Sequence, residues 1–526
     1  MRLRSFAMIS VACACAHPHH PRAPNLTENP DVREFAALAW APDQPTYLWT
    51  AHSVRDAQRG IADAIDSFGM LTGATAAGTG QLLEQVLSVD PLSESGVQRL
   101  GVDPAGAVAM FSTGLDPTIV VQLASPDTTR AFFDHIKATN GVATRSIIVD
   151  GVEVSTVKLF GHVSASWAID SSSTWPGGPG GPGGPGGPGT EPWLWVHFAF
   201  GVDTASQPAA PDGDWFAKAH APHRGAWTTS FARAKQLRGA SSAAANGGLL
   251  GFIDTRALLA IARAHVPREA PAQVIACIER FHPVGLAGFA IEGDGHHAGG
   301  RLAFDLGPTA AASVASAVLP PPGGFAALAS TAPIAVQWNL DLDAIARFLA
   351  PCAASIGGDA DFLTRFGVRT ARVAVLTLEP ERRSGTGVVA ADLADATYLR
   401  GLLDQIPHRS LLESDHSYAG IAGHRISIPF VLSLDYVLTD RLGMLAVGDG
   451  LMDKLVAGTT ARPPLFALDV VVPGLSEATW NYVIAQATNE WFAKRATSLL
   501  QRWHDGHVRV TIDHDALVVE ASGNRR

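Results

Sequence analysis

The residues best suited to chemistry lie near the C-terminus of this sequence, where histidines and a carboxylate gather. His504, His507 and His514 occur close together, and Asp513 adjoins His514. A hydrolase could use such groups as a general acid and a general base if the fold brings two of them within hydrogen-bonding reach. A zinc site is disfavoured, because His504 and His507 could hold one ion together only from a helix, and the pattern there favours a strand.

Motifs that mark the common enzyme classes are missing from the chain. It contains no phosphate-binding P-loop, no GxSxG nucleophile elbow, no HExxH zinc motif and no CxxC pair. A literal GxGxxG that begins at Gly181 belongs to a Pro-Gly repeat, and no helix follows it as a dinucleotide site would require. We therefore expect no catalytic residues, no bound metal and no cofactor. A hydrolase with an unrecognised active site is the alternative.

Tryptophans beside a low-complexity insertion form a second candidate site. Residues 176–189 read PGGPGGPGGPGGPG, which predicts a disordered loop between strands at 162–170 and 193–200. Trp193 and Trp195 are two residues apart, so in a strand their side chains face the same side of the sheet. Packing in the core is the favoured interpretation. The alternative is an exposed aromatic binding surface for a glycan, a peptide or a lipid.

Composition and charge exclude two classes of protein. Hydrophobic residues make up 47% and charged residues 17% of the 526, which excludes a chain that is disordered throughout. The net charge is −10 and no basic stripe occurs, so we expect no nucleic-acid partner. The length corresponds to more than one domain of ordinary size.

Residues 1–16 predict a signal peptide. Arg2 and Arg4 precede an uncharged run from Phe6 to Ala16. Such a run suits the apolar region of a signal peptide and is too short to span a bilayer as a helix. No other stretch of the sequence is long and apolar enough to predict a second membrane span. We therefore expect an exported protein.

The end of this segment predicts a lipid anchor. Small residues surround Cys13 and Cys15, as in bacterial lipoprotein signals, where a cysteine after small residues receives lipid. Ordinary cleavage without lipidation is the alternative. Residues 17–44 are expected to be a flexible tether. The protein is thus predicted to lie in the cell envelope, held at a membrane by Cys13 or Cys15 and facing the periplasm or the outer surface.

Two stretches of the sequence, 100–136 and 366–406, follow one pattern. Each begins with Leu-Gly-Val or Phe-Gly-Val, runs through a strand, a turn and a second strand, and finishes in an amphipathic helix. The segments that follow also correspond, because 149–155 resembles 421–427. The chain therefore contains an internal repeat.

The repetition predicts an α+β fold made of two homologous halves. We place the halves at 45–310 and 333–525, with a linker at 311–332 in which three prolines precede two glycines. Each half opens with a strand and a helix, and closes with a helix and a hairpin. Period-two alternation in the hairpins suits strands with one buried face. We expect each half to be a largely antiparallel sheet with packed helices.

Two cysteines lie outside the N-terminal segment. Cys277 and Cys352 each occur in a helix-like stretch, far apart in the sequence. An exported protein can form a disulfide between them. Two buried free thiols are an equally good interpretation, because cysteine packs well as a small hydrophobic residue. The sequence leaves this choice open.

Several motifs resemble bacterial envelope proteins of unknown function with a duplicated α+β domain. They are the opening PIAVQWNLDLDAIARFL, the LGV and FGV motifs, and the closing LTDRLGMLAVGDGLMDKLVAG. The resemblance covers most of residues 45–525 and rests on structural motifs of low specificity. It implies a location in the cell envelope and offers no catalytic residues.

The leading functional hypothesis is a non-enzymatic envelope lipoprotein. Duplication without a convergent set of polar residues favours a protein that binds a ligand or an envelope protein partner through sheet surfaces or the groove between its halves. One alternative is a hydrolase with an unrecognised active site, for example one that involves His504, Asp513 or His514. The other is a structural periplasmic spacer.

Overall fold

The computed structural model of this protein describes most of the chain from residue 29 onward. The described residues are 29–72, 75–140, 144–160, 163–171, 191–200, 213–220, 223, 225–238, 248–265, 272–280, 284–294, 296–355, 367–382, 384–405, 412–428, 432–458, 463–485, 497 and 501–526. The predicted signal peptide with Cys13 and Cys15, and the Pro-Gly loop at 176–189, lie outside them. In these ranges no helix is long and apolar enough to cross a membrane.

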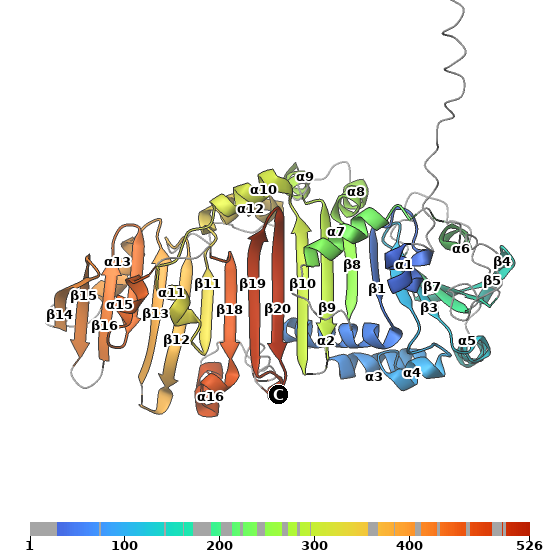
Figure 1. Cartoon of the computed structure of the whole chain (residues 1–526), viewed down its shortest axis with the longest axis horizontal. Helices are drawn as coiled ribbons and strands as arrows, with labels where there is room; N and C mark the ends of the chain where they lie inside the picture. The colour runs from blue at the N-terminus through green and yellow to red at the C-terminus, as the bar shows by residue number, and fades with distance from the viewer. Residues whose placement is uncertain are drawn as a thin grey trace, which may run out of the picture.

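Strands of the described residues form one antiparallel sheet (Figure 1). The strands before residue 311 are β1 (Tyr47–Ala51), β2 (Val108–Ser112), β3 (Thr118–Gln122), β4 (Thr144–Val149), β5 (Val152–Phe160), β6 (Val163–Asp170), β7 (Trp193–Ala199), β8 (Leu249–Asp254), β9 (Leu286–Gly293) and β10 (His297–Asp305). Those after it are β11 (Ile334–Trp338), β12 (Ala371–Glu379), β13 (Ser384–Asp392), β14 (Glu413–Tyr418), β15 (Ile421–Ile428), β16 (Leu432–Leu438), β17 (Leu442–Val447), β18 (Phe466–Val471), β19 (Asp505–Asp513) and β20 (Ala516–Asn524).

The strand order of the second half repeats that of the first. From one edge to the centre the order is β4-β5-β6-β7-β3-β2-β1-β8-β9-β10. From the other edge it is β14-β15-β16-β17-β13-β12-β11-β18-β19-β20. Each strand of the second half thus takes the place of the strand ten positions earlier in the chain.

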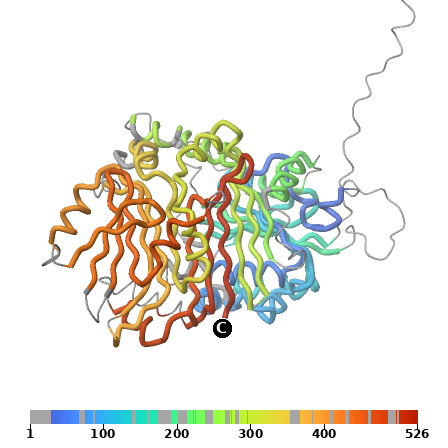
Figure 2. The backbone as a smooth tube through the Cα atoms, turned by 60° about the vertical axis from the view of Figure 1, so that its left-hand side comes forward, coloured from blue at the N-terminus to red at the C-terminus, as the bar shows by residue number. Residues whose placement is uncertain are grey.

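The two halves meet where β10 pairs with β20, which we call the seam (Figure 2). His297 lies opposite Asn524 at one end of the pairing, and Asp305 lies opposite Ala516 at the other. The middle residues of the two strands, Arg301 and Glu520, face each other. The prediction of an α+β class built from antiparallel strands is confirmed, but the sheet is continuous across the seam rather than divided between the halves.

Helices lie on both sides of the sheet and beyond its ends (Figure 1). They are α1 (Pro30–Glu34), the 3-10 helix η2 (Ala36–Trp40), α2 (Val54–Thr72), α3 (Ala76–Leu87), α4 (Glu94–Arg99), α5 (Pro126–Asn140), α6 (Asp214–His220), α7 (Thr228–Arg238), α8 (Thr255–His265), α9 (Ala272–Arg280), α10 (Gly307–Ser316), α11 (Phe325–Ala329), α12 (Leu342–Ser355), η5 (Pro380–Arg382), α13 (Thr397–Asp404), α15 (Leu451–Val456), η6 (Val472–Gly474) and α16 (Glu477–Ala485). We call the side of the sheet that η2, α7, α11 and α15 cover the covered face, because their residues share core clusters with it.

Residues 29–44 correct one expectation from the sequence. We predicted them to be part of a flexible tether, but they form α1 and η2. Phe35, Leu38 and Trp40 are buried in the core of the first half. The side chain of Asn29 accepts a hydrogen bond from the backbone of Asp31 and so caps α1. The tether prediction is wrong from residue 29 onward, because burial of these apolar side chains outweighs the entropy of a free chain.

The linker predicted at 311–332 is also corrected. This segment contains the end of α10 and all of α11, and Phe325 and Leu328 of α11 are buried in the core of the second half. The prolines and glycines at 320–324 separate the two helices instead of forming a free linker.

Gly101 and Gly367, from the repeated motifs, occupy the same place in each half. Both have a positive φ, +77° and +66°, which favours glycine. The carbonyl of Gly101 accepts hydrogen bonds from the amides of residues 124 and 125, and that of Gly367 from the amides of residues 394 and 395. In each half the next residue forms an isolated bridge to the strand that precedes the helix, Val102 to Leu123 and Val368 to Leu393. The two motifs therefore have the same local topology.

The halves are fastened to each other beyond both ends of the seam. At the upper end of Figure 1, α9 of the first half packs against α12 of the second, and a Cys277–Cys352 disulfide joins them. At the lower end, Arg525 forms an ion pair with Asp63 on α2. Gly293 leaves room for this pair, because a Cβ there would collide with the Asp63 carboxylate. The structure thus selects the disulfide over two free thiols.

Candidate functional site

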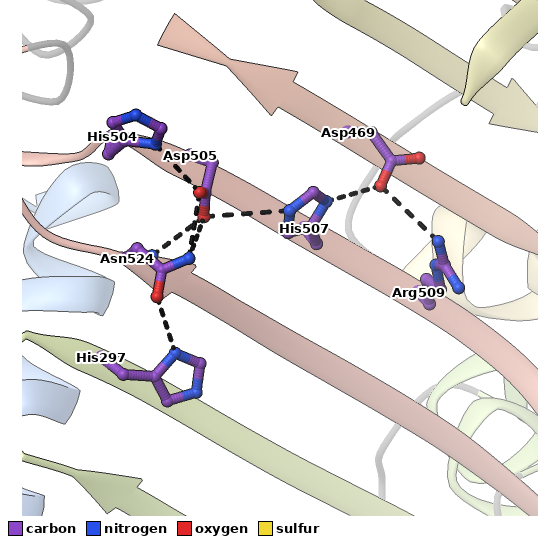
Figure 3. Close-up of polar contacts among 7 residues, drawn as sticks. All are labelled: His297, Asp469, His504, Asp505, His507, Arg509 and Asn524. Atoms are coloured by element: carbon purple, nitrogen blue, oxygen red, sulfur yellow. Dashed lines mark hydrogen bonds and ion pairs between the residues drawn. The ribbon is translucent and has the colours of Figure 1, made fainter. Parts of the chain in front are cut away.

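A network of polar side chains lies at the lower end of the seam, with Asp505 at its centre (Figure 3). The backbone and the side-chain amide of Asn524 both donate hydrogen bonds to Asp505, at 3.0 Å. His504 Nδ1 lies 3.1 Å from the same carboxylate. Burial opposes ionisation of Asp505, but the bonds from Asn524 and His504 outweigh it and hold the pKa of this carboxyl below its usual range.

A second part of the network is a histidine–carboxylate pair on neighbouring strands. His507 Nδ1 on β19 lies 2.7 Å from Asp469 Oδ1 on β18. Arg509 Nη2 lies 3.8 Å from the same oxygen. Ser522 on β20 is the cross-strand partner of His507 on its other side. A carboxylate that orients a histidine beside a serine is the order of groups in serine hydrolases.

The arrangement of Asp469, His507 and Ser522 lacks two features of a hydrolase site, a hydrogen bond from the serine to the histidine and the exclusion of water. No hydrogen bond joins Ser522 to His507 among the described residues, and His507 Nε2 lies 3.8 Å from Asp505 instead. His507 is partly exposed and Ser522 is exposed on the face of the sheet, so water is not excluded from them. Among the residues that the structure describes, no group of three or more histidines, cysteines and carboxylates could hold a metal ion.

The residues suggested for a hydrolase are not brought together. His504 precedes β19, whereas Asp513 ends this nine-residue strand and His514 follows it, so roughly 25 Å of strand separates them. The side chain of His514 is 93% exposed, and its Nε2 lies 3.8 Å from the carboxylate of its neighbour Asp513. These three residues therefore do not form one active site. The Asp469–His507 pair escaped prediction because 38 residues of chain separate two strands whose pairing no local motif reveals.

Trp193 and Trp195 lie in the core of the first half. They are 1% and 0% exposed. The ring of Trp195 lies 4.9 Å from that of Trp40 and 5.6 Å from that of Phe216, both edge to face. The favoured interpretation, core packing, agrees with this arrangement. The alternative of an exposed aromatic surface is wrong for these two residues, because η2 and α6 cover them.

An apolar surface lies on the side of the sheet opposite to the covered face. Two rows of side chains, each paired directly from strand to strand, run across its centre and second half. Row one consists of Phe289, Leu302, Val519, Val510, Phe466 and Trp338. Row two consists of Val508, Leu468, Val336, Val373, Val389 and Leu445. We call these residues the open face.

The open face remains accessible to solvent. Every side chain in the two rows is partly exposed, and that of Val389 is 38% exposed. On β11, β12, β13 and β17 their neighbours along the strand point to the covered face and are buried, as Ala335, Ala374, Ala390 and Ala446 show with 0–1% exposure. Contiguous exposed apolar surface of this kind is typical of interaction sites.

In an ordinary sheet the larger apolar side chains face the covering helices, but in this sheet the larger ones lie on the uncovered side. Alanines lie under α11 and α15, whereas valines, leucines and aromatic residues lie on the open face. Trp338 and Phe466 are in edge-to-face contact there, with ring centroids 5.8 Å apart. Helices cover the flanks of this side of the sheet, where Val54 and Ala57 of α2 and Trp480 of α16 are buried. The larger apolar side chains are thus placed where a partner can reach them.

Sequence reasoning missed the open face. Alternation in a segment such as 507–521 showed that one side of a strand is apolar, but it did not show which side the helices cover. The only available signal was the alternation of alanine with larger apolar residues in β11 and β12.

Comparison with known proteins gives one distant likeness. No protein-family model and no curated protein matches the chain. Three crystal structures of TP0453 match weakly. TP0453 is an envelope protein of Treponema. Crystal form III has a TM-score of 0.26 and 10% identity, covering 54% of this chain and 86% of that one. Crystal form I has a TM-score of 0.24 and 11% identity, covering 52% and 79%. Likeness at this level carries no functional inference.

Proposed function

We propose that this protein is a non-enzymatic component of the bacterial cell envelope that binds an apolar ligand on its open face. The observation that carries the proposal is the exposure of the two apolar rows beside a covered face of buried alanines. Removing such a surface from water is favourable by about 25 cal/mol for each Å² of apolar area. A ligand that covers it therefore gains affinity without any catalytic group.

The envelope location rests on two features of the chain. Residues 1–16 have the pattern of a signal peptide, with Cys13 or Cys15 as the site of a lipid anchor. The Cys277–Cys352 disulfide is typical of proteins that leave the cytoplasm. The common strand order of the halves also supports their origin by tandem duplication of one α+β unit.

Binding of bis-ANS, a dye that becomes fluorescent on apolar protein surfaces, to the folded protein tests this proposal. The double variant V510Q/V519Q places two polar side chains in the middle of row one. The double variant T511Q/S522Q changes the same two strands on the opposite side of the sheet and serves as the matched control. We expect V510Q/V519Q to raise the Kd of the dye about tenfold or more, and the control to leave it unchanged.

Circular dichroism and thermal unfolding confirm that both variants are folded before the comparison. Equal dye affinity in V510Q/V519Q and the wild type would contradict the proposal. Loss of dye binding in T511Q/S522Q to the same extent would contradict it as well, because the site would then not be confined to the open face.

A further inference from the structure

The shape of the open face restricts what it can bind. Row one crosses six neighbouring strands, from Phe289 on β9 to Trp338 on β11. Strands in a sheet lie about 4.8 Å apart, so the row is roughly 24 Å long. Row two begins at Val508, lies beside row one on β19, β18 and β11, and continues to Leu445 on β17, so it also crosses six strands. The surface is therefore a long strip whose axis lies across the strands.

The chemistry of the strip is uniform. All of its side chains are hydrocarbon apart from the indole of Trp338, whose N–H donates to the carbonyl of Leu340 at 2.7 Å. The backbone amides and carbonyls of the strands beneath are used in the ladders between them. The strip thus offers no hydrogen-bonding group to a ligand that lies along it.

This uniformity disfavours a peptide or a glycan. Each peptide group pressed against the strip would lose its hydrogen bonds to water without replacement, and so would each sugar hydroxyl. A peptide that binds a sheet does so at an edge, where free backbone groups are available. A ligand that lies flat over roughly 24 Å of this surface must itself be long and free of polar groups.

On the basis of the proposed function, we infer that the open face binds the acyl chains of lipids, laid across the strands along its two rows. The predicted anchor supports this choice of ligand. A chain of 14 residues from Cys15 to Asn29, the first described residue, spans at most about 50 Å, so a molecule anchored at Cys15 stays beside a lipid bilayer. We therefore expect lipid from that bilayer, rather than a soluble ligand, to occupy the open face.

Competition between fatty acids and a fluorescent acyl probe tests the inference. The full-length chain carries Cys13→Ser and Cys15→Ser, so that its own lipid cannot occupy the face. Cis-parinaric acid is the probe, and saturated fatty acids of 8 to 16 carbons displace it. We expect affinity to rise severalfold with each two added methylenes, because each one extends the apolar contact. We also expect V510Q/V519Q to weaken binding about tenfold relative to T511Q/S522Q.

Other outcomes identify other occupants and overturn the inference. If bis-ANS binds the open face but fatty acids neither bind nor compete, the proposed function stands and the acyl ligand is wrong. If the wild type is a dimer by light scattering and V510Q/V519Q is a monomer, a second copy of the chain covers the face. The last comparison is made in the presence of phosphatidylcholine vesicles. If the Ser variant binds the acyl probe there and the lipidated protein does not, the acyl groups of the anchor itself occupy the open face, rather than bilayer lipid.

Discussion

Arg301 and Glu520 are the middle residues of β10 and β20, and they form an ion pair across the seam. Each strand has nine residues, and each of these two residues is the fifth. They therefore hold equivalent positions in the two halves. A local twofold axis that relates the strand orders of the halves passes between these two residues. Opposite charges at this point stabilise the contact between the two halves. If the two halves had identical sequences, the same charged residue would face itself here and the two charges would repel each other.

Reversal of one charge in this pair should weaken the seam. The variant E520R places two guanidinium groups opposite each other, and we expect it to lower the free energy of unfolding by about 1–3 kcal/mol, since the side chains are 14% and 41% exposed. The swap R301E/E520R should restore most of the loss. Urea unfolding measures both effects. If the swap lowers the free energy of unfolding by as much as E520R and R301E do when their separate losses are added, the ion pair does not stabilise the seam.

The equivalent glycines provide a test of the repeated topology. A Cβ at residue 101 or 367 would meet the carbonyl oxygen of Ser125 or Asp395, and both glycines have a positive φ. We expect G101A and G367A each to cost about 1–3 kcal/mol of stability. The control is G401A in α13, where a Cβ meets no atom within 4 Å and alanine favours the helix. A loss in only one of the two glycine variants would argue against equivalent roles.

The correspondence between the motifs of the two halves could be predicted from the sequence because its signals are local. The Gly-Val motifs, the amphipathic helices and the turns recur at matching spacing, and they correspond to the places of Gly101 and Gly367 in the structure. The continuous sheet could not be predicted, because the pairing of β10 with β20 joins residues more than 200 positions apart. The burial of Trp40 beside Trp195 is a tertiary contact that the tether-like sequence before it concealed.

The candidate site was harder to predict than the fold. Histidines can be recognised in the sequence as chemical groups, but the residues that pair with them lie on other strands, as Asp469 does for His507. The open face consists of ordinary apolar residues, and only the position of the helices distinguishes it from a core. A local sequence pattern does not indicate which face of a sheet a helix covers.

Removal of the disulfide should destabilise the protein without changing ligand affinity. The bond closes a separation of 75 residues, for which chain entropy gives about 4 kcal/mol. We expect the double variant C277S/C352S to unfold at a lower urea concentration by a corresponding amount, and its bis-ANS affinity to stay within about twofold of the wild type, because the open face does not include α9 or α12. Unchanged stability would mean that the bond does not hold α9 to α12 in solution.

Acidification should destabilise the first half through His197. Burial lowers the pKa of this imidazole to about 4, and a hydrogen bond with the backbone of Pro117 opposes the shift only in part. In the unfolded chain the pKa is near 6.5, so between pH 6.5 and 4 the unfolded state binds a proton that the folded state does not. Stability is therefore complete above pH 6.5 and falls by about 3 kcal/mol as the pH approaches 4.

The variant H197Q isolates this contribution. Glutamine does not titrate, so the difference in unfolding free energy between wild type and H197Q should change between pH 6.5 and 4 and stay constant above pH 6.5. Chemical denaturation at several pH values measures it. Parallel curves for the two proteins over that interval would contradict a buried, neutral His197.

Photolabelling with a fatty acid that carries a diazirine shows where lipid binds, because mass spectrometry then identifies the residues that the bound ligand touches. We expect labels on β18, β19, β20, β11 and β12 at residues of the open face, such as Val510, Phe466 and Val373, with little label on V510Q/V519Q. Labels concentrated on the covered face, on the polar network around Asp505, or scattered without regard to the two rows would contradict this expectation.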